Sequence, residues 1–179
     1  MAAHARFREL VLPHLDAGYN LARWLARDVN DAQDIVQDAC LRALRYIDAL
    51  QGRDARAWFL TIVRHAFYDW RQRNHAPLAD DGADPIEEMV DPTALDPETA
   101  ALQQEQAHAL VAAVARLPLP FREVLLLREL EDLSYKEIAR VVEAPVGTVM
   151  SRLARARALL RASTTPPAKT RAARSEETP

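Results

Sequence analysis

Four arginines and no acidic residue lie between Thr148 and Arg161, on a segment whose apolar residues have helical spacing. At about 100° per residue, Thr148, Ser151, Arg152 and Arg155 share one flank of such a helix. Small hydroxyl side chains near a helix N-terminus, with arginines further along, are what a recognition helix presents to base edges and phosphates in the DNA major groove. The pattern therefore predicts a helix that reads duplex DNA. Arginines that only keep a helix face solvated would give the same pattern, so this alternative stays open.

A second segment, residues 53–73, mixes basic side chains with five of the eleven aromatic residues of the chain. Basic side chains bind phosphates and ring faces receive unstacked bases, a combination suited to single-stranded or melting DNA. Trp58, Phe67 and Trp70 fall on the stripe expected to face inward and are predicted core residues. The residues assigned to contact with melted DNA are Arg53, Phe59, Arg64, His65 and Tyr68.

No pattern in the sequence indicates catalysis. The chain has no Gly-rich phosphate loop, no paired carboxylates in a plausible pocket and no Ser/His/Asp or Cys/His constellation. Its single cysteine, Cys40, cannot form an intrachain disulfide, and its five scattered histidines lack zinc-ligand spacing. We therefore expect no catalytic residue, no metal or other cofactor and no small-molecule substrate.

The composition indicates the class of fold that positions these residues. The chain has 179 residues, of which 49% are hydrophobic, enough for one medium domain or two small ones. Four glycines, abundant Ala, Leu, Arg and Glu, and few alternating β-branched runs predict an all-α protein. Since no run approaches the ~18 apolar residues of a membrane helix and no secretory signal is recognisable, we expect a cytoplasmic location without membrane insertion.

The charged residues are unevenly distributed along the chain, although the formal net charge is only −3. Eight acidic residues and no Lys or Arg lie between Asp80 and Glu98, together with several prolines, which resist helix. This predicts an acidic, proline-rich linker over residues 76–98. It would join helical domains at 1–75 and 99–163, and residues 164–179 are predicted to be a disordered tail.

Apolar spacing predicts the helices within each domain. The first covers 5–28 with a break near Pro13, the second begins with Asn30 or Asp31 as N-cap and ends near Gly52, and the third covers 54–73. Further helices are expected at 99–116 and 121–131.

Two short helices follow. Ser134 and Glu137 have the spacing of a capping box, which marks a helix start at 134. This helix cannot continue through Pro145, and the turn around it leads into the segment described first. Two short helices joined by a tight turn predict a helix-turn-helix, although this geometry also occurs in proteins that do not bind DNA.

The chain resembles bacterial RNA polymerase sigma factors of the extracytoplasmic-function (ECF) type, which keep only the second and fourth conserved regions of larger sigma-70 factors. The resemblance covers about residues 5–163 and depends on three blocks in the order of the family. These are DAQDIVQDACLRALR at 31–45, RAWFLTIVRHAFYDWRQR at 56–73 and LPLPFREVLLLRELEDLSYKEIARVVEAPVGTVMSRLARAR at 117–157. It implies a sigma factor that binds core RNA polymerase, through its β and β′ subunits, and promoter DNA.

The resemblance also implies where each activity lies. Asp34, Gln37 and Asp38 would dock onto the clamp helices of β′. The loop at 50–54 and the following helix would open the minus-10 element and hold a flipped base, and the arginine-bearing flank would read the minus-35 element. Met150 stands where many members carry arginine. An anti-sigma factor that masks both domains is a further implied partner.

Two other functions stay compatible with the sequence. A stand-alone helix-turn-helix repressor or activator would bind its operator tightly by itself, usually as a dimer on a palindrome. A protein-interaction adaptor built from helical pairs would leave the arginine flank unexplained.

Overall fold

The structure, a computed structural model, describes residues 2–52, 54–74 and 97–164, and within these ranges it contains helices and turns but no strand. This confirms the predicted all-α class. The helices are α1 (Ala2–Leu10), the 3-10 helix η1 (Leu12–His14), α2 (Leu15–Ala26), α3 (Val29–Arg45), the 3-10 helix η2 (Ile47–Leu50), α4 (Ala55–Arg73), α5 (Pro97–Ala115), α6 (Leu119–Glu129), α7 (Tyr135–Val141) and α8 (Val146–Thr164).

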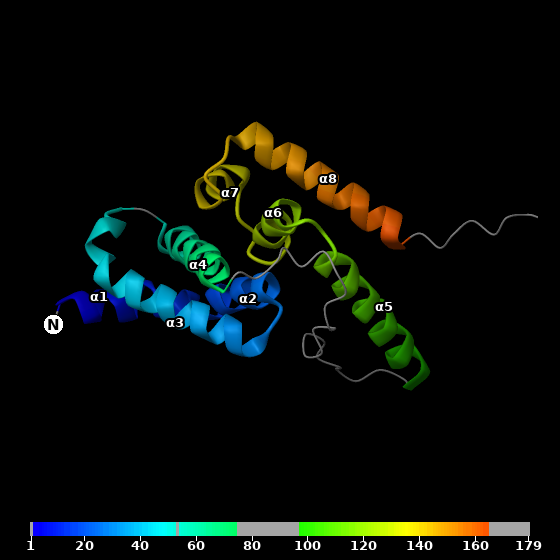
Figure 1. Ribbon diagram of the computed structural model, residues 1–179, viewed down its shortest axis with the longest axis horizontal. Helices are drawn as coiled ribbons and strands as arrows, with labels where there is room; N and C mark the ends of the chain where they lie inside the picture. The colour runs from blue at the N-terminus through cyan, green and yellow to red at the C-terminus, as the bar shows by residue number, and fades with distance from the viewer. Residues whose placement is uncertain (1, 53, 75–96, 165–179) are drawn as a thin grey trace, which may run out of the picture.

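Helices α2, α3 and α4 pack around a shared apolar core (Figure 1). Ile35 of α3 and Phe59, Leu60 and Val63 of α4 are almost completely buried there. Gly18 lets α2 approach α4 closely, because a Cβ at this position would lie 2.5 Å from Cε1 of Phe59. The α4 helix is therefore held by its inner face, which fixes the side chains that its outer face presents.

The predicted start of α3 was wrong by two to three residues. The cap is Asp28, whose carboxylate accepts hydrogen bonds from the backbone N–H groups of Asn30 (2.8 Å) and Asp31 (3.0 Å). The chain reaches this cap through Arg27, which ends α2 in a left-handed conformation with φ of 67°. The helix also ends earlier than expected, at Arg45, and η2 fills the stretch before Gly52.

The capping box that was predicted at the start of α7 is confirmed. The Ser134 hydroxyl accepts from the Glu137 N–H at 3.3 Å, and the Glu137 carboxylate accepts from the Ser134 N–H at 2.7 Å. Helix α8 follows after the turn that contains Glu143, at φ of 53°, and Pro145. Helices α7 and α8 therefore form the predicted helix-turn-helix.

Two other boundaries also differ from the predictions. Helix α5 already begins at Pro97, so the last two residues assigned to the linker are helical, while the rest of the linker lies outside the described residues. Helix α6 begins at Leu119 because Pro120 fits the first turn of a helix, where its missing N–H is not needed. The predicted tail lies outside the described residues except for Thr164, which ends α8.

The C-terminal helices pack against the N-terminal ones. Helix α7 contacts α4, and α6 contacts α2 (Figure 1). Among the helices described, none combines the length and the apolar character needed to cross a membrane.

Candidate nucleic-acid and protein interfaces

The flank of α8 that carries Thr148, Ser151, Arg152 and Arg155, here called the reading flank, is partly open to solvent. Ser151 and Arg155 are exposed, while Thr148 and Arg152 are half-buried. The Ser151 hydroxyl donates to the Thr148 carbonyl at 2.9 Å, a local bond that a serine near a helix N-terminus readily exchanges for another acceptor. Within the described part of the chain, the Arg155 guanidinium has neither a hydrogen bond nor an ion pair. Arg155 is therefore available to a ligand.

The opposite side of α8 fixes its orientation. Val149, Leu153 and Ala156 are buried against the rest of the C-terminal half. Arg157 is tied to Glu129 of α6 by an ion pair of 2.7 Å. Arg157 thus belongs to the anchoring of α8, and the reading flank points away from this anchored side.

Three of the residues assigned to melted DNA lie together on α4. The Arg64 guanidinium lies 4.6 Å from the centre of the Tyr68 ring, and His65 is adjacent. Burial, followed by the negative charge of Glu123, raises the pKa of Tyr68 to about 12. Arg56, which sequence reasoning did not assign, joins them on the side facing the C-terminal helices. Arg56, Arg64, His65 and Tyr68 are called the α4 face below.

The assignment of Phe59 to DNA contact was wrong. Its side chain is 0% exposed and packs into the space left by Gly18. The buried side of α4 is centred on Phe59, Leu60 and Val63, whereas Trp58 and Trp70 pack against the core while staying half-exposed. Arg53, the remaining assigned residue, lies outside the described residues.

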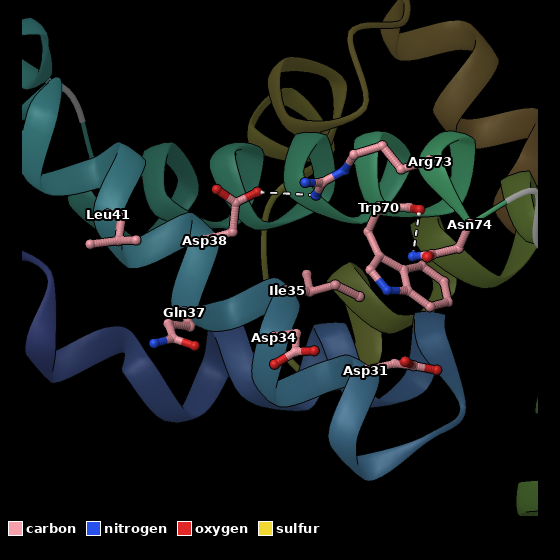
Figure 2. A pocket seen from close by; sticks show the side chains of 9 residues that line it. All are labelled: Asp31, Asp34, Ile35, Gln37, Asp38, Leu41, Trp70, Arg73 and Asn74. Carbon is pink, nitrogen blue, oxygen red and sulfur yellow. Dashed lines mark hydrogen bonds and ion pairs between the residues drawn. The ribbon is translucent and has the colours of Figure 1, made fainter.

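A groove of ≈ 620 Å³ runs between α3 and the C-terminal end of α4 (Figure 2). All three predicted docking residues line it. The lining residues are Asp31, Asp34, Ile35, Gln37, Asp38, Leu41, Trp70, Arg73 and Asn74.

Acidic side chains dominate the α3 side of this groove. Asp34 and Gln37 are exposed, and Asp38 lies at 2.8 Å from Arg42 and 3.6 Å from Arg73 across the groove (Figure 2). Burial, together with repulsion from Asp28 and Asp34, raises the pKa of Asp31. The groove therefore offers negative charge that the protein itself only partly neutralises.

Sequence reasoning missed the apolar part of the groove. Leu41 is 64% exposed, and Trp70 covers the groove at its other end. Leu41 lies three residues after Asp38 on α3, so its exposure could have been expected from the same helical face. An acidic rim around apolar side chains suits an amphipathic helix with basic residues.

The described residues contain no cluster of three or more His, Cys, Asp or Glu side chains that could hold a metal ion. Cys40 is a half-buried thiol, and burial raises its pKa.

Comparison with known families explains why these surfaces occur on one chain. The Sigma-70 region 2 model matches residues 10–76 and the Sigma-70, region 4 model matches residues 107–160. Helices α2 to α4 thus form a region 2 unit, and α6 to α8 with part of α5 form a region 4 unit. The fold and the order of the two regions define a protein of the sigma-70 class.

Similar proteins of known name identify a narrower family within the sigma-70 class. The ECF RNA polymerase sigma-E factor of Escherichia coli is 34% identical over 134 residues, which cover 71% of this chain and 70% of that protein. The sigma-E factor of Haemophilus influenzae is 33% identical over 147 residues, or 78% and 77% of the two chains. The chain belongs to the ECF RNA polymerase sigma factors, which act in promoter-directed transcription initiation with RNA polymerase.

Two solved structures have similar folds. The sigma factor RpoE from Bartonella quintana, in complex with the anti-sigma factor NepR, matches with a TM-score of 0.72 at 25% identity, covering 88% of this chain and 95% of that one. CnrH, in complex with the cytosolic domain of CnrY, matches with a TM-score of 0.61 at 26% identity, covering 87% and 85%.

Proposed function

We propose that this chain is a dissociable promoter-specificity subunit that binds core RNA polymerase, reads the minus-35 element as duplex and captures the melted minus-10 strand. The observation that carries the proposal is the reading flank of α8, an arginine-bearing surface fixed to a helix-turn-helix in a chain that also has the region 2 unit. A cytoplasmic location follows from this function.

Minus-35 recognition is assigned to the reading flank. Arg155 and Arg152 have the reach to contact guanine edges or phosphates, and Thr148 and Ser151 supply short donors and acceptors near the helix N-terminus. A good bidentate contact of Arg with guanine contributes about 1–3 kcal/mol of discrimination against the wrong base. The anchoring of α8 by its buried side and by Arg157 supports this role, because a reader must be held rigidly.

Minus-10 capture is assigned to α4. Arg64 and Arg56 are cations for the backbone of a single strand, and Tyr68 and His65 offer ring surfaces for an unstacked base. Arg53 stays in this assignment on the sequence alone, since it lies outside the described residues. Phe59 does not, because its ring supports the helix from inside.

Docking onto core polymerase is assigned to the groove between α3 and α4. Asp34, Gln37 and Asp38 supply the polar contacts and Leu41 an apolar anchor. The structure of Bartonella quintana RpoE in complex with the anti-sigma factor NepR supports a further proposal, that an anti-sigma factor binds this chain as well.

The direct test of assembly uses two matched substitutions on α3. Gln37→Arg places a positive charge in the groove, whereas Gln33→Arg places the same charge one turn away, on an exposed residue outside it. In competition with the wild-type chain for core polymerase, Gln37→Arg should bind at least several-fold more weakly, because it adds positive charge where we expect the partner to be basic. Gln33→Arg should compete normally. Equal competition by both variants would reject the docking site, and failure of the wild-type chain to bind core polymerase would reject the proposed function.

A further inference from the structure

Arginines gather where α2 of the region 2 unit meets α6 of the region 4 unit (Figure 1). Arg23 lies on the last turn of α2, and Arg27 follows four residues later as the residue that ends this helix. Arg122 lies near the start of α6. The charge of Arg27 acts on Arg122, so these two guanidinium groups are close to each other. Arg23, Arg27 and Arg122 are called the junction arginines below.

Arg122 is a buried cation whose bonds do not neutralise its charge. The residue is 4% exposed, and its Nη2 donates to the carbonyl oxygens of Ala115 at 2.6 Å and Leu117 at 2.9 Å. These carbonyls hold the guanidinium against the end of α5, but they carry no net charge. Burial, followed by repulsion from Arg27, lowers the pKa of Arg122 to about 10. The surroundings of Arg122 therefore disfavour its charged form.

Two of these side chains also have a buried donor that is not used. Nε of Arg122 and Nη1 of Arg23 are buried, and neither has a hydrogen-bond partner within the described residues. No carboxylate of that part of the chain pairs with either side chain. Glu123 follows Arg122 directly in the sequence, but its carboxylate is bonded to Arg64 and Tyr68. Buried donors and buried charges normally have partners, so the arrangement lacks an anion.

We propose that the junction arginines form a binding site for a small phosphate-class oxyanion. Arg122 supplies the buried end of the site, with Nε as its donor. Arg23 supplies Nη1 from α2, and Arg27 adds a further positive charge beside Arg122. Because Arg23 and Arg27 are only half-buried, an ion from solution has access to the site through them.

The chemistry of arginine favours this class of ligand. A guanidinium group donates parallel N–H groups that match the spacing of phosphate oxygens, and a tetrahedral anion has enough oxygens to accept from more than one arginine. Two negative charges also offset the repulsion between Arg27 and Arg122 better than one does. A bound ion contacts α2 and α6 together, so it stabilises the folded chain through both units.

The test compares the full chain in inorganic phosphate and in sodium chloride of equal ionic strength. Thermal unfolding reports stabilisation by the ion, and isothermal titration calorimetry with inorganic phosphate reports affinity and stoichiometry. Arg23→Gln removes one charge and one buried donor without touching the bonds between Arg122 and α5. Arg45→Gln is the matched control, since Arg45 is an exposed arginine in the last turn of α3.

Phosphate at about ten times its Kd should raise the unfolding midpoint of the wild-type chain by about 3–5 °C relative to chloride, with one ion bound per chain. Arg45→Gln should behave in the same way, whereas Arg23→Gln should bind phosphate roughly tenfold more weakly. If Arg23→Gln folds poorly, Arg23→Lys keeps the charge, loses the paired N–H groups and should bind with intermediate affinity. An equal rise in all variants would overturn the site, because phosphate stabilises folded proteins in general. Absence of binding by the wild-type chain, and of any gain in the variant described next, would overturn it as well.

Carboxylates of the chain itself are another possible source of an oxyanion. A further variant therefore replaces all eight acidic residues from Asp80 to Glu98 by their amides. We expect this variant and the wild-type chain to bind phosphate with similar affinity. Phosphate binding by this variant but not by the wild-type chain would overturn the proposal and assign the junction arginines to the chain's own carboxylates.

Discussion

Helices α4 and α8 both present arginines proposed to meet DNA, but their surroundings differ. On α8, Arg155 is exposed and makes no ion pair within the described part of the chain. On α4, Arg56 and Arg64 are engaged by glutamates from another part of the same chain. Exposure and partners, rather than residue type, thus distinguish Arg155 from the arginines of α4, whose charges are already paired within the chain.

The comparison depends on α4 being a rigid platform, and the largest expected effect comes from removing its support. Phe59→Ala should lower the free energy of unfolding by about 3–5 kcal/mol, because a fully buried ring against Gly18 is replaced by a cavity. Chemical denaturation followed by circular dichroism measures this loss. Phe59→Leu, which keeps most of the apolar volume, should cost clearly less. A stable Phe59→Ala protein with weaker DNA binding would instead restore Phe59 to the contact surface.

The exposed reading flank of α8 is tested by removing Arg155. Arg155→Ala should weaken minus-35-dependent promoter binding of the holoenzyme by about ten- to a hundredfold, which corresponds to the loss of one base-contacting arginine. Affinity for core polymerase should stay unchanged, as should the stability of the chain. Arg116→Ala, at an exposed site outside the reading flank, is the control. Promoter-specific transcription at the wild-type level by Arg155→Ala would count against the reading flank.

The burial of Tyr68 on α4 next to Glu123 has a signature in the titration of its hydroxyl. Its pKa, raised to about 12 in the folded chain by burial first and by Glu123 next, lies above the ~10 of an unfolded tyrosine. The resulting stabilisation is therefore complete below pH ~10 and is lost as the pH rises toward about 12. Phenolate absorbance, taken as the difference between the wild-type chain and Tyr68→Phe, should show this high midpoint, and Glu123→Gln should lower it. A midpoint near ~10 in the wild-type chain would mean that the Tyr68 hydroxyl is not buried beside Glu123.

The smallest expected effect is a gain in DNA affinity from a substitution on α8. Met150 is 52% exposed at a position where many family members carry arginine. Met150→Arg should strengthen holoenzyme binding to promoter duplex by a few-fold and steepen the salt dependence by about one released counterion, if the new charge meets a phosphate. Salt titration of binding measures both, with Met150→Gln as the uncharged control. An unchanged salt slope would place residue 150 away from the DNA.

Sequence patterns predicted the parts of the molecule that depend on local chemistry. The capping box at Ser134 and the turn at Pro145 are confirmed, because caps and turns depend on residues a few positions apart. The cap of α3 was misplaced because Asp28, Asn30 and Asp31 are all good capping residues, and only the path of the chain through Arg27 decides between them.

Features that depend on tertiary packing could not be predicted in this way. Gly18 of α2 leaves space for the Phe59 ring and so decides which side of α4 faces the core. The spacing of Phe59 along the helix would by itself also allow an outward position. The pairs of Arg64 with Glu123 and of Arg56 with Glu131 join residues 59 and 75 positions apart. No periodicity within a single helix encodes such contacts.

The most direct measurement of the central claim is reconstituted transcription with mapped start sites. The purified chain, core bacterial RNA polymerase and a library of upstream fragments are combined, each protein is also tested alone, and duplex binding by the chain alone is measured in parallel. We expect discrete start sites only when both proteins are present, and weak duplex binding by the chain alone. Tight duplex binding without polymerase, and no new start sites with it, would contradict the account and identify a stand-alone helix-turn-helix regulator.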